Sequence, residues 1–467
     1  MTGSESGQIF KKRPLDGIRV VDLSRVFAMP FAGANLADFG AEVIKIDTHH
    51  TQFMDTTRTI TGPFPDNDPG EAYWERAGTF HTLNRGKTSL TLDLRSEAAQ
   101  DLLKDLVRVS DIVLENFTPR VMARFGLDYA SLRAVRPDLI MVSNTGYGHS
   151  GPWSNFGAMA SALEPTHGTG AFMGYLEDSP NGRAPEDAPN KMGNSYTDFL
   201  ATWTALTAIM ASLLYRARTG QGNWVDLAMY QVGVSYAGEG ILDYAFNGRR
   251  TRRMGNRHQS MAPHGCYPCQ GENQWVTIAV RDDADWRAFS QVLAVEEGFG
   301  GILDEKFEEP LGRLNNQDEL DDIVSRWTST QGQYQVMEVL QKAGVPAGPV
   351  LNARGLLTDP HFRDRGYFEA VEHPPETGLG RREYIGRGWR LSKNDLSITK
   401  PASLLGEEND LVLHQLLGLT EAQIQSLEQV DLIGKTPVGG TAPATVSLER
   451  QVELGWTVER DPDFLPR

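Results

Sequence analysis

The stretch that decides the fold is IRVVDLSRVFAMPFAGANLADFGAEVIKID, residues 18–47. It begins with a short β-rich run at 18–23, and apolar residues then recur at helical spacing over 26–39. A glycine at position 40 is typical of a helix C-cap, and a second β-rich run follows at 42–47. The stretch therefore predicts a strand, a helix and a second strand.

The same alternation continues beyond this unit. Strands alternating with helices, separated by short polar loops, are typical of a doubly wound parallel sheet in an α/β protein. A long helix that ends at Arg216, Arg218 and Gly220 follows these elements. The predicted strands are 88–94, 111–115 and 138–143, and the predicted helices are 96–109 and 196–218.

The pattern of predicted strands and helices changes after residue 220. Two further strands are predicted at 223–229 and 274–280, on either side of a basic, glycine-containing loop, and short helices follow to about residue 344. We interpret 225–350 as a second, smaller α+β domain. Residues 407–433 again look helical, and 436–467 lack periodicity, which predicts an extended tail.

Composition limits the classes of function. The chain has 467 residues and a formal net charge of −16, and it contains no polybasic run, which argues against a nucleic-acid partner. It has only two cysteines, which favours a reducing compartment and hence the cytoplasm. No stretch approaches roughly 18 apolar residues, and the first residues lack a signal-like apolar region, so we expect neither export nor a membrane span.

Generic catalytic motifs are absent from the sequence. We find no phosphate-binding G-x-x-x-x-G-K-[ST], no H-E-x-x-H and no G-x-S-x-G. Cys266 and Cys269 form a single C-x-x-C without a second pair or a nearby histidine at ligand spacing. We therefore expect no metal site.

Several segments, in this order and spacing, carry a more specific signal. The segments are PLDGIRVVDLSRVFAMPFAGANLADFGAEVIKID at 14–47, LNRGKTSLTLDL at 83–94, ENFTPRVMARFGLDYASL at 115–132, TGYGHSGP at 145–152, RARTGQGNWVDLAM at 216–229, GNRHQSMAPHGCY at 255–267, and GVPAGPVLN with DPHFRDRGYFEAVEHP at 344–374. Together they make the chain resemble the family III CoA-transferases, the CaiB/BaiF family.

This resemblance implies an architecture and a ligand. The large α/β domain would be built from both chain ends, 1–220 and 351–435, and two subunits would interlock like linked rings. Coenzyme A, as an acyl-CoA substrate, would lie at the carboxyl ends of the strands. The residues that the resemblance assigns to it are Val26, Ala28, Asn84, Lys87, Asn116, Phe117 and Arg124. Lysine and arginine suit the phosphate charges of CoA.

The resemblance also implies an aspartate nucleophile, whose carboxylate attacks the acyl thioester. Counting back from the small-residue turn places Ala160 at that position, and no aspartate lies between Asp138 and Asp178. Three hypotheses follow. Glu164 serves as a displaced catalytic carboxylate; the chain is the Asp-lacking subunit of a heteromer, similar to benzylsuccinate CoA-transferase, with an Asp-bearing paralogue as partner; or it is an acyl-CoA racemase, or only binds acyl-CoA. We favour the heteromer, which would transfer CoA from a donor such as succinyl-CoA to a carboxylic acid.

Overall fold

The structure, a computed structural model, describes residues 13–60, 62–175, 196–250, 253–394, 396–457 and 461. The chain divides into two compact units. Among the described residues, unit 1 contains 13–169, 196–241 and 364–461, and unit 2 contains 170–175 and 242–363. Unit 1 is therefore assembled from three separate stretches of the chain.

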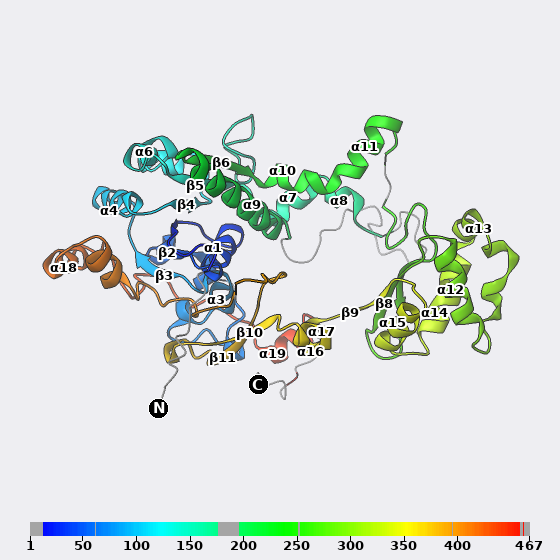
Figure 1. Ribbon diagram of the computed structural model, residues 1–467. Helices are drawn as coiled ribbons and strands as arrows, with labels where there is room; N and C mark the ends of the chain where they lie inside the picture. The colour runs from blue at the N-terminus through cyan, green and yellow to red at the C-terminus, as the bar shows by residue number, and fades with distance from the viewer. Residues whose placement is uncertain are drawn as a thin grey trace, which may run out of the picture. The chain divides into compact units, whose positions relative to one another are not determined.

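Unit 1 is built on a six-stranded parallel sheet with the strand order β3-β2-β1-β4-β5-β6 (Figure 1). Val20 in the centre of β1 pairs with Val43 of β2 on one side and with Ile112 of β4 on the other. The order confirms the predicted doubly wound α/β fold. The strands are β1 (Arg19–Asp22), β2 (Glu42–Asp47), β3 (Thr88–Thr91), β4 (Ile112–Glu115), β5 (Ile140–Thr145) and β6 (Asn223–Ala228).

The sixth strand corrects one prediction. We placed 223–229 in the small domain, but β6 pairs in parallel with β5 and closes the large sheet at its edge. The sequence gives no direct signal for this, because a crossover helix and its following strand can join either sheet. The chain leaves unit 1 later, within α11 (Gly238–Asn247), and returns at residue 364.

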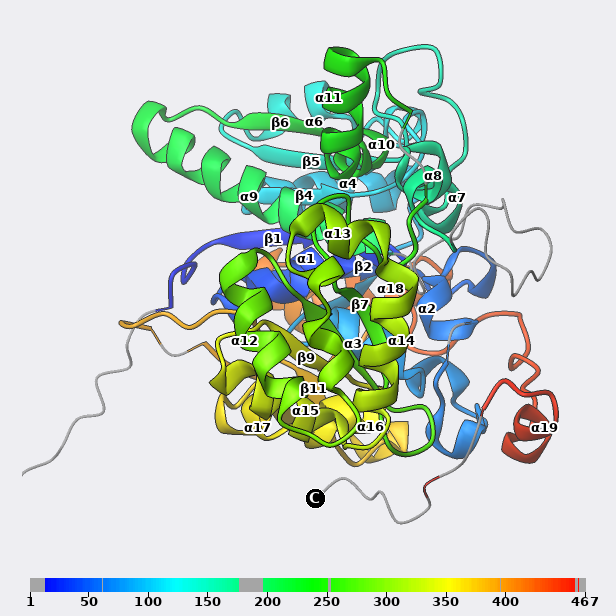
Figure 2. The same ribbon diagram turned by 90° about the vertical axis from the view of Figure 1, so that its right-hand side faces the viewer.

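Helices cover both faces of the sheet (Figures 1 and 2). Because successive strand residues point to opposite faces, Val20 packs in a core with α1 (Ala28–Asp38) and α9 (Tyr196–Thr219). Val21 packs in a second core with α4 (Glu97–Arg108), α6 (Tyr129–Val135) and α18 (Glu421–Gln429). Among the described residues, α9 is the one helix whose length and composition would suit a membrane span; here it packs on α1 as a core helix.

The remaining elements of unit 1 are short. A two-stranded hairpin of β10 (Phe368–Glu372) and β11 (Arg381–Ile385) follows the return of the chain. The other helices are α2 (Thr56–Thr59), α3 (Gly78–Asn84), α5 (Val121–Arg124), α7 (Ala160–Thr166), α8 (Thr169–Phe172), which continues into unit 2, α10 (Met229–Val234) and a π-helix at Leu411–Leu416.

The C-terminal segment differs from the extended tail that we expected. Val438 accepts a hydrogen bond from the Thr51 hydroxyl at 3.1 Å, and its N–H donates to His49. A helix, α19 (Leu448–Glu453), follows, and the Ser447 side chain caps its N-terminus. The segment therefore packs on unit 1 through Val438. The helix α19 has only six residues, which is too short for the spacing of apolar residues to predict it.

Unit 2 has a three-stranded antiparallel sheet of β7 (His264–Pro268), β8 (Trp275–Ala279) and β9 (Ala347–Val350). Its core includes the buried side chains of Phe289 and Trp327. Cys266 lies in β7, Cys269 follows it, and both are free thiols. The helices are α12 (Asp283–Ala294), α13 (Pro310–Asn315), α14 (Gln317–Thr328), α15 (Gln333–Lys342), α16 (Ala353–Thr358) and α17 (Pro360–Asp364), the last ending at the start of unit 1.

Candidate active site

The strand order reverses between β1 and β4, and in sheets of this class the loops beyond the carboxyl ends of those two strands form the ligand-binding crevice. From β1 the chain proceeds to β2 and β3 on one side of the sheet, and from β4 it proceeds to β5 and β6 on the other. The loops that leave the carboxyl ends of β1 and β4 therefore run in opposite directions, and ligands of such sheets bind between them. These loops begin at Leu23 and at Asn116, so the crevice is built by the segments that the sequence singled out.

Asn116 clamps the loop after β1. Its Oδ1 accepts a hydrogen bond from the Arg25 backbone N–H at 2.8 Å, and its Nδ2 donates to the Arg25 carbonyl at 2.7 Å. The Arg25 guanidinium lies over the ring of Phe117, 5.2 Å from its centroid. Asn116 thus holds the backbone of the loop, and its amide groups are already occupied by that task.

The next residue of this loop, Val26, has a strained backbone. Its φ is +71°, which β-branched residues rarely adopt, and its side chain is 39% exposed. The Val26 N–H donates to Oδ1 of Asp55 at 3.2 Å. Strain of this kind persists only where the surroundings enforce it, and Asp55 supplies that restraint from below the loop.

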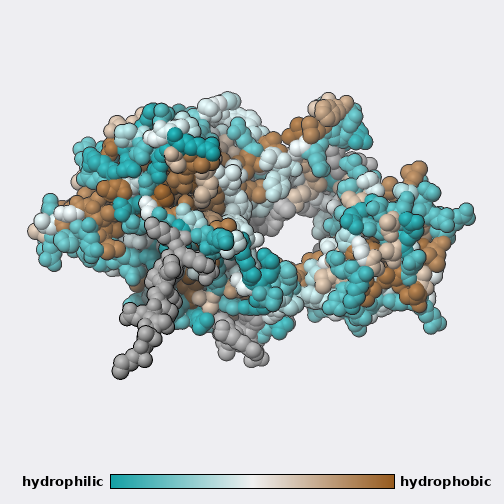
Figure 3. All heavy atoms as spheres, viewed as in Figure 1, coloured by the Kyte–Doolittle hydropathy of each residue, from teal (hydrophilic) through white to brown (hydrophobic). Residues whose placement is uncertain are grey.

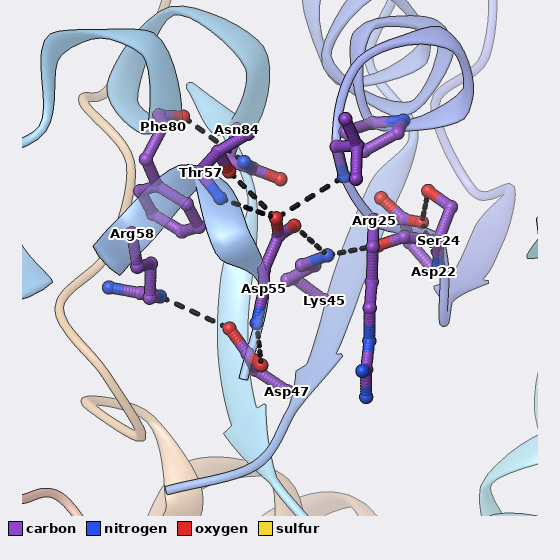
Figure 4. Close-up of polar contacts among 12 residues, drawn as sticks. Asp22, Ser24, Arg25, Lys45, Asp47, Asp55, Thr57, Arg58, Phe80 and Asn84 are labelled. Atoms are coloured by element: carbon purple, nitrogen blue, oxygen red, sulfur yellow. Dashed lines mark hydrogen bonds and ion pairs between the residues drawn. The ribbon is translucent and has the colours of Figure 1, made fainter. Parts of the chain in front are cut away.

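Asp55 is fully buried in the middle of a charge network (Figure 4). Lys45 Nζ donates to its Oδ2 at 3.0 Å, and the Thr57 hydroxyl donates to its Oδ1 at 2.8 Å. Burial opposes ionisation of Asp55, but Lys45 and the hydrogen bonds from Thr57 outweigh it and keep the pKa below its usual value. The loop is therefore anchored on a charged and buried carboxylate.

Lys87 and Asn84 lie beneath the first turn of α1. Lys87 Nζ donates to Asp22 at 2.7 Å, to the Pro30 carbonyl at 2.8 Å and to Asn84 Oδ1 at 2.8 Å. Burial lowers the pKa of Lys87 to about 8. A Cβ at Gly33 would come within 2.8 Å of Asp22, which explains the glycine at this position. All three hydrogens of Lys87 are engaged, so it supports α1 and presents no free donor to a phosphate.

Ala28 connects this loop to α9. Thr202 in α9 donates its hydroxyl hydrogen to the Ala28 carbonyl at 2.6 Å, and the Ala28 N–H is hydrogen-bonded to the carboxyl of Asp198 one turn earlier. Asp198 therefore lies at the N-terminus of α1. Burial, and after it the charge of Glu164, raise the pKa of Asp198 to about 7, and the Ala28 N–H opposes both.

Glu164 lies in α7, and its side chain is 1% exposed. Among the described residues neither of its carboxylate oxygens has a hydrogen-bond partner. Its charge acts on Asp198 and also on Tyr196, whose hydroxyl donates to Thr169 at 2.8 Å. A buried carboxylate without a partner is costly, and this unusual arrangement marks the space between α7 and the start of α9 as a candidate reaction site.

The structure thus brings together most of the residues that the sequence suggested. Val26, Ala28, Asn116 and Phe117 gather at the crevice between β1 and β4, and Glu164 acts on the same carboxyl that binds Ala28. Arg124 ends α5 with an exposed side chain, and among the described residues its guanidinium has no ion-pair partner. Ala160, the expected nucleophile position, starts α7 and is buried in the apolar core.

Asp198 is the functional candidate that sequence reasoning missed. We searched only as far as Asp178 for a replacement carboxylate, within the segment around Ala160. The signal was present in YTDF at 196–199, an acidic residue in the first turn of the long helix. Only the fold places that turn against α1, because the contacting residues Thr202 of α9 and Ala28 of α1 are 174 positions apart in the chain.

A second perturbed carboxyl lies at the carboxyl end of β4. Burial raises the pKa of Glu115 to about 7, against hydrogen bonds from Ser143 and the Phe117 N–H. His149 lies 4.0 Å from the other oxygen of Glu115, and burial lowers its pKa. Glu115 thus accepts a hydrogen bond from the Phe117 backbone N–H and holds this side of the crevice in place. Within the described ranges, no group of three or more His, Cys, Asp or Glu side chains is arranged to hold a metal ion.

Comparison with known proteins gives consistent matches over most of the chain. Residues 15–409 match the model of CoA-transferase family III. The chain is similar to the succinate–glutarate CoA-transferase of Agrobacterium fabrum, with 32% identity over 408 residues that cover 87% of this chain and 96% of that protein. It is equally similar to the succinyl-CoA–D-citramalate CoA-transferase of Chloroflexus aurantiacus, with 32% identity over 421 residues that cover 89% and 97%.

A solved structure agrees with these matches. A CaiB/BaiF family protein from Brucella suis superposes with a TM-score of 0.74 at 31% sequence identity. The superposition covers 87% of this chain and 100% of that one.

Proposed function

Because the chain belongs to CoA-transferase family III, as its sequence resemblance indicated, we propose that it moves CoA from a donor such as succinyl-CoA to a carboxylic acid with Asp198 as nucleophile. The chain is an enzyme, a CoA-transferase. The observation that carries the assignment of Asp198 is its half-buried carboxyl at the N-terminus of α1, with a pKa of about 7. A carboxyl with this pKa is partly ionised at neutral pH and remains basic in its ionised form, which suits a nucleophile.

The reaction needs a group that is both nucleophile and acyl carrier. The ionised Asp198 carboxylate attacks the thioester carbonyl, the C–S bond breaks, and the products are a mixed anhydride and the CoA thiolate. The thiolate then attacks the Asp198 carbonyl carbon, which releases the donor acid and leaves an Asp198–CoA thioester. The acceptor carboxylate attacks the carbonyl of this thioester, the C–S bond breaks, and a second mixed anhydride forms together with the CoA thiolate. The thiolate then attacks the acceptor carbonyl of that anhydride, which gives the acceptor acyl-CoA and releases the Asp198 carboxylate.

The crevice between β1 and β4 suits the cofactor portion of the substrate. We propose that Val26, Ala28 and Phe117 contact CoA, and that Arg124 meets its phosphates from the rim. Lys87 and Asn84 act indirectly, since their polar groups already hold α1 in place. Asn116 likewise positions the backbone of the loop. The family resemblance implied direct contact with CoA for all seven residues, and the hydrogen bonds of Asn84, Lys87 and Asn116 support a positioning role for these three.

The heteromer hypothesis rested on Ala160 at the position of the nucleophile, and a nucleophilic Asp198 would take that reason away. We therefore favour the hypothesis that this chain catalyses CoA transfer without an Asp-bearing paralogue such as the one in benzylsuccinate CoA-transferase. The named relatives act on succinate, glutarate and citramalate, all dicarboxylates. We propose a dicarboxylic acid of this kind as the acceptor. We also propose that the enzyme acts in the cytoplasm, a reducing compartment in which Cys266 and Cys269 would remain free thiols.

We also propose that two copies of this chain assemble into the interlocked dimer that the family resemblance implies. Apolar side chains gather on α11 (Figure 3), where Ile241, Leu242, Tyr244 and Phe246 are 49–80% exposed. A helix this apolar and this exposed is unfavourable in water, and a second copy would cover it. Sedimentation at nanomolar concentration should give a dimer, and a stable monomer of 51.6 kDa would contradict it.

Trapping of the covalent intermediate tests the nucleophile. The purified chain is incubated with succinyl-CoA, quenched with hydroxylamine or borohydride, and digested for mass spectrometry. We expect the modification on the peptide that contains Asp198, its loss in Asp198→Asn, and its persistence in Glu164→Gln. Modification of Glu164 would instead support the displaced carboxylate, and no modification without a co-expressed paralogue would support the heteromer.

A further inference from the structure

Unit 1 contains an apolar cavity of about 510 Å³ that the steps above do not use. It opens between α1, α3 and the β10–β11 hairpin, and Phe27, Phe31, Phe64 and Phe199 contribute to its wall. The volume lies in the range of small-molecule sites, which are commonly lined by apolar and aromatic side chains with few polar groups. The cavity is too small for a whole CoA molecule and large enough for an acyl group.

The cavity adjoins the proposed nucleophile. Phe199 follows Asp198 in α9, and Phe27 precedes Ala28, whose N–H is hydrogen-bonded to Asp198. Phe199 also packs edge-on against Phe31 of α1, with ring centroids 5.6 Å apart. Part of the wall is therefore formed by the residues that adjoin Asp198 and Ala28 along the chain.

The polar groups in the wall are few, and one of them carries a positive charge. Arg382, on β11, is the single lysine or arginine among the lining residues, all of which the structure describes. Its guanidinium donates to the Arg381 carbonyl at 2.9 Å, and among the described residues it has no ion-pair partner. The Thr82 hydroxyl is engaged with the Gly78 carbonyl at 3.0 Å. Arg382 thus has donors to spare for an anion.

We propose that this cavity binds the body of the acid substrate and that Arg382 holds a second carboxylate, one that does not react. The inference rests on the proposed function and names its substrate class: a dicarboxylic acid whose carbon skeleton carries an apolar or aryl group. Phenylalanine walls reward burial of apolar surface, and a guanidinium matches a carboxylate in a paired, planar geometry. Glu383, the neighbouring residue of the wall, would disfavour an acid whose second charge approached from its side.

Two acceptor acids with one phenyl group each test the proposal. Phenylsuccinate has the second carboxylate, and 3-phenylpropanoate lacks it. With succinyl-CoA as donor, Arg382→Met should raise the KM for phenylsuccinate on the order of 10- to 100-fold, the effect of losing a charge-assisted hydrogen bond. The KM for 3-phenylpropanoate should change less than about twofold, and Arg382→Lys should recover part of the loss. Equal effects on both acids, or none, would overturn the role of Arg382.

Arg381→Met is the matched control. Arg381 is the preceding residue of β11, its side chain is exposed, and it is not among the residues that line the cavity. It should leave both KM values unchanged. Calorimetry in the absence of succinyl-CoA measures the affinity of the enzyme for each of the two acids, independently of turnover. Absent CoA transfer to any acid would refute the proposed function, whereas transfer without preference for phenylsuccinate in calorimetry would refute only the cavity assignment.

Discussion

Glu164 offers a sharp test of how the carboxyl of Asp198 is tuned. Both carboxyls are in low-dielectric surroundings, and the charge of Glu164 is the second cause, after burial, that raises the pKa of Asp198 to about 7. Replacing Glu164 by Gln keeps the shape and removes the like charge. The pKa of Asp198 should therefore fall, and the ionised nucleophile should be available at lower pH.

The size of the effect follows from the ionised fraction. With a pKa of about 7, roughly one tenth of Asp198 is ionised at pH 6, and a decrease of one unit raises this to about one half. We expect kcat/KM of Glu164→Gln to be about fivefold higher than that of the wild type at pH 6, with little difference at pH 8. The profile should keep its shape and shift to lower pH.

The assay is the rate of CoA transfer from succinyl-CoA between pH 5 and pH 9. Glu428→Gln, in the exposed face of α18, is the matched control and should leave the profile unchanged. A profile of Glu164→Gln that coincides with the wild type, or shifts to higher pH, would refute the coupling. Complete loss of activity together with loss of the Asp198 adduct would show that Glu164 has a direct role.

Three further predictions concern the support of the crevice. Asp55→Asn leaves Lys45 buried without its charged partner, so denaturant unfolding should show a loss of about 3–5 kcal/mol, and calorimetry should show weaker CoA binding. Lys87→Met removes the support of α1 and leaves Asp22 unpaired; we expect lower thermal stability together with weaker CoA binding, and stability unchanged with affinity lost would instead indicate direct phosphate contact. For Glu115, the folded-state pKa of about 7 exceeds its usual 4.5, so the stability that the carboxyl contributes is present below pH 4.5 and is lost as the pH rises to 7. Glu115→Gln should remove that loss, making the variant more stable at pH 8 by up to about 3 kcal/mol and not at pH 4, as melting at both pH values would reveal.

The sequence by itself determined the class of fold and most of the crevice. Local signals predict the strands and the helix of 18–47: β-branched runs, helical spacing of apolar residues and a glycine at position 40. The structure gives this glycine a φ of +107°, which suits the end of a helix. These features depend on neighbours a few residues apart, so they survive without knowledge of the fold. The order of motifs likewise identified the family and, through it, the loops after β1 and β4.

The tertiary structure decided which side chains meet. Asp198 became a candidate only because α9 packs against α1, and only the fold brings Asp22, Pro30 and Asn84 to the three hydrogens of Lys87. The placement of β6 at the edge of the large sheet has the same origin. Such facts depend on contacts between distant segments, and burial then sets their pKa values. Local periodicity carries no information about either.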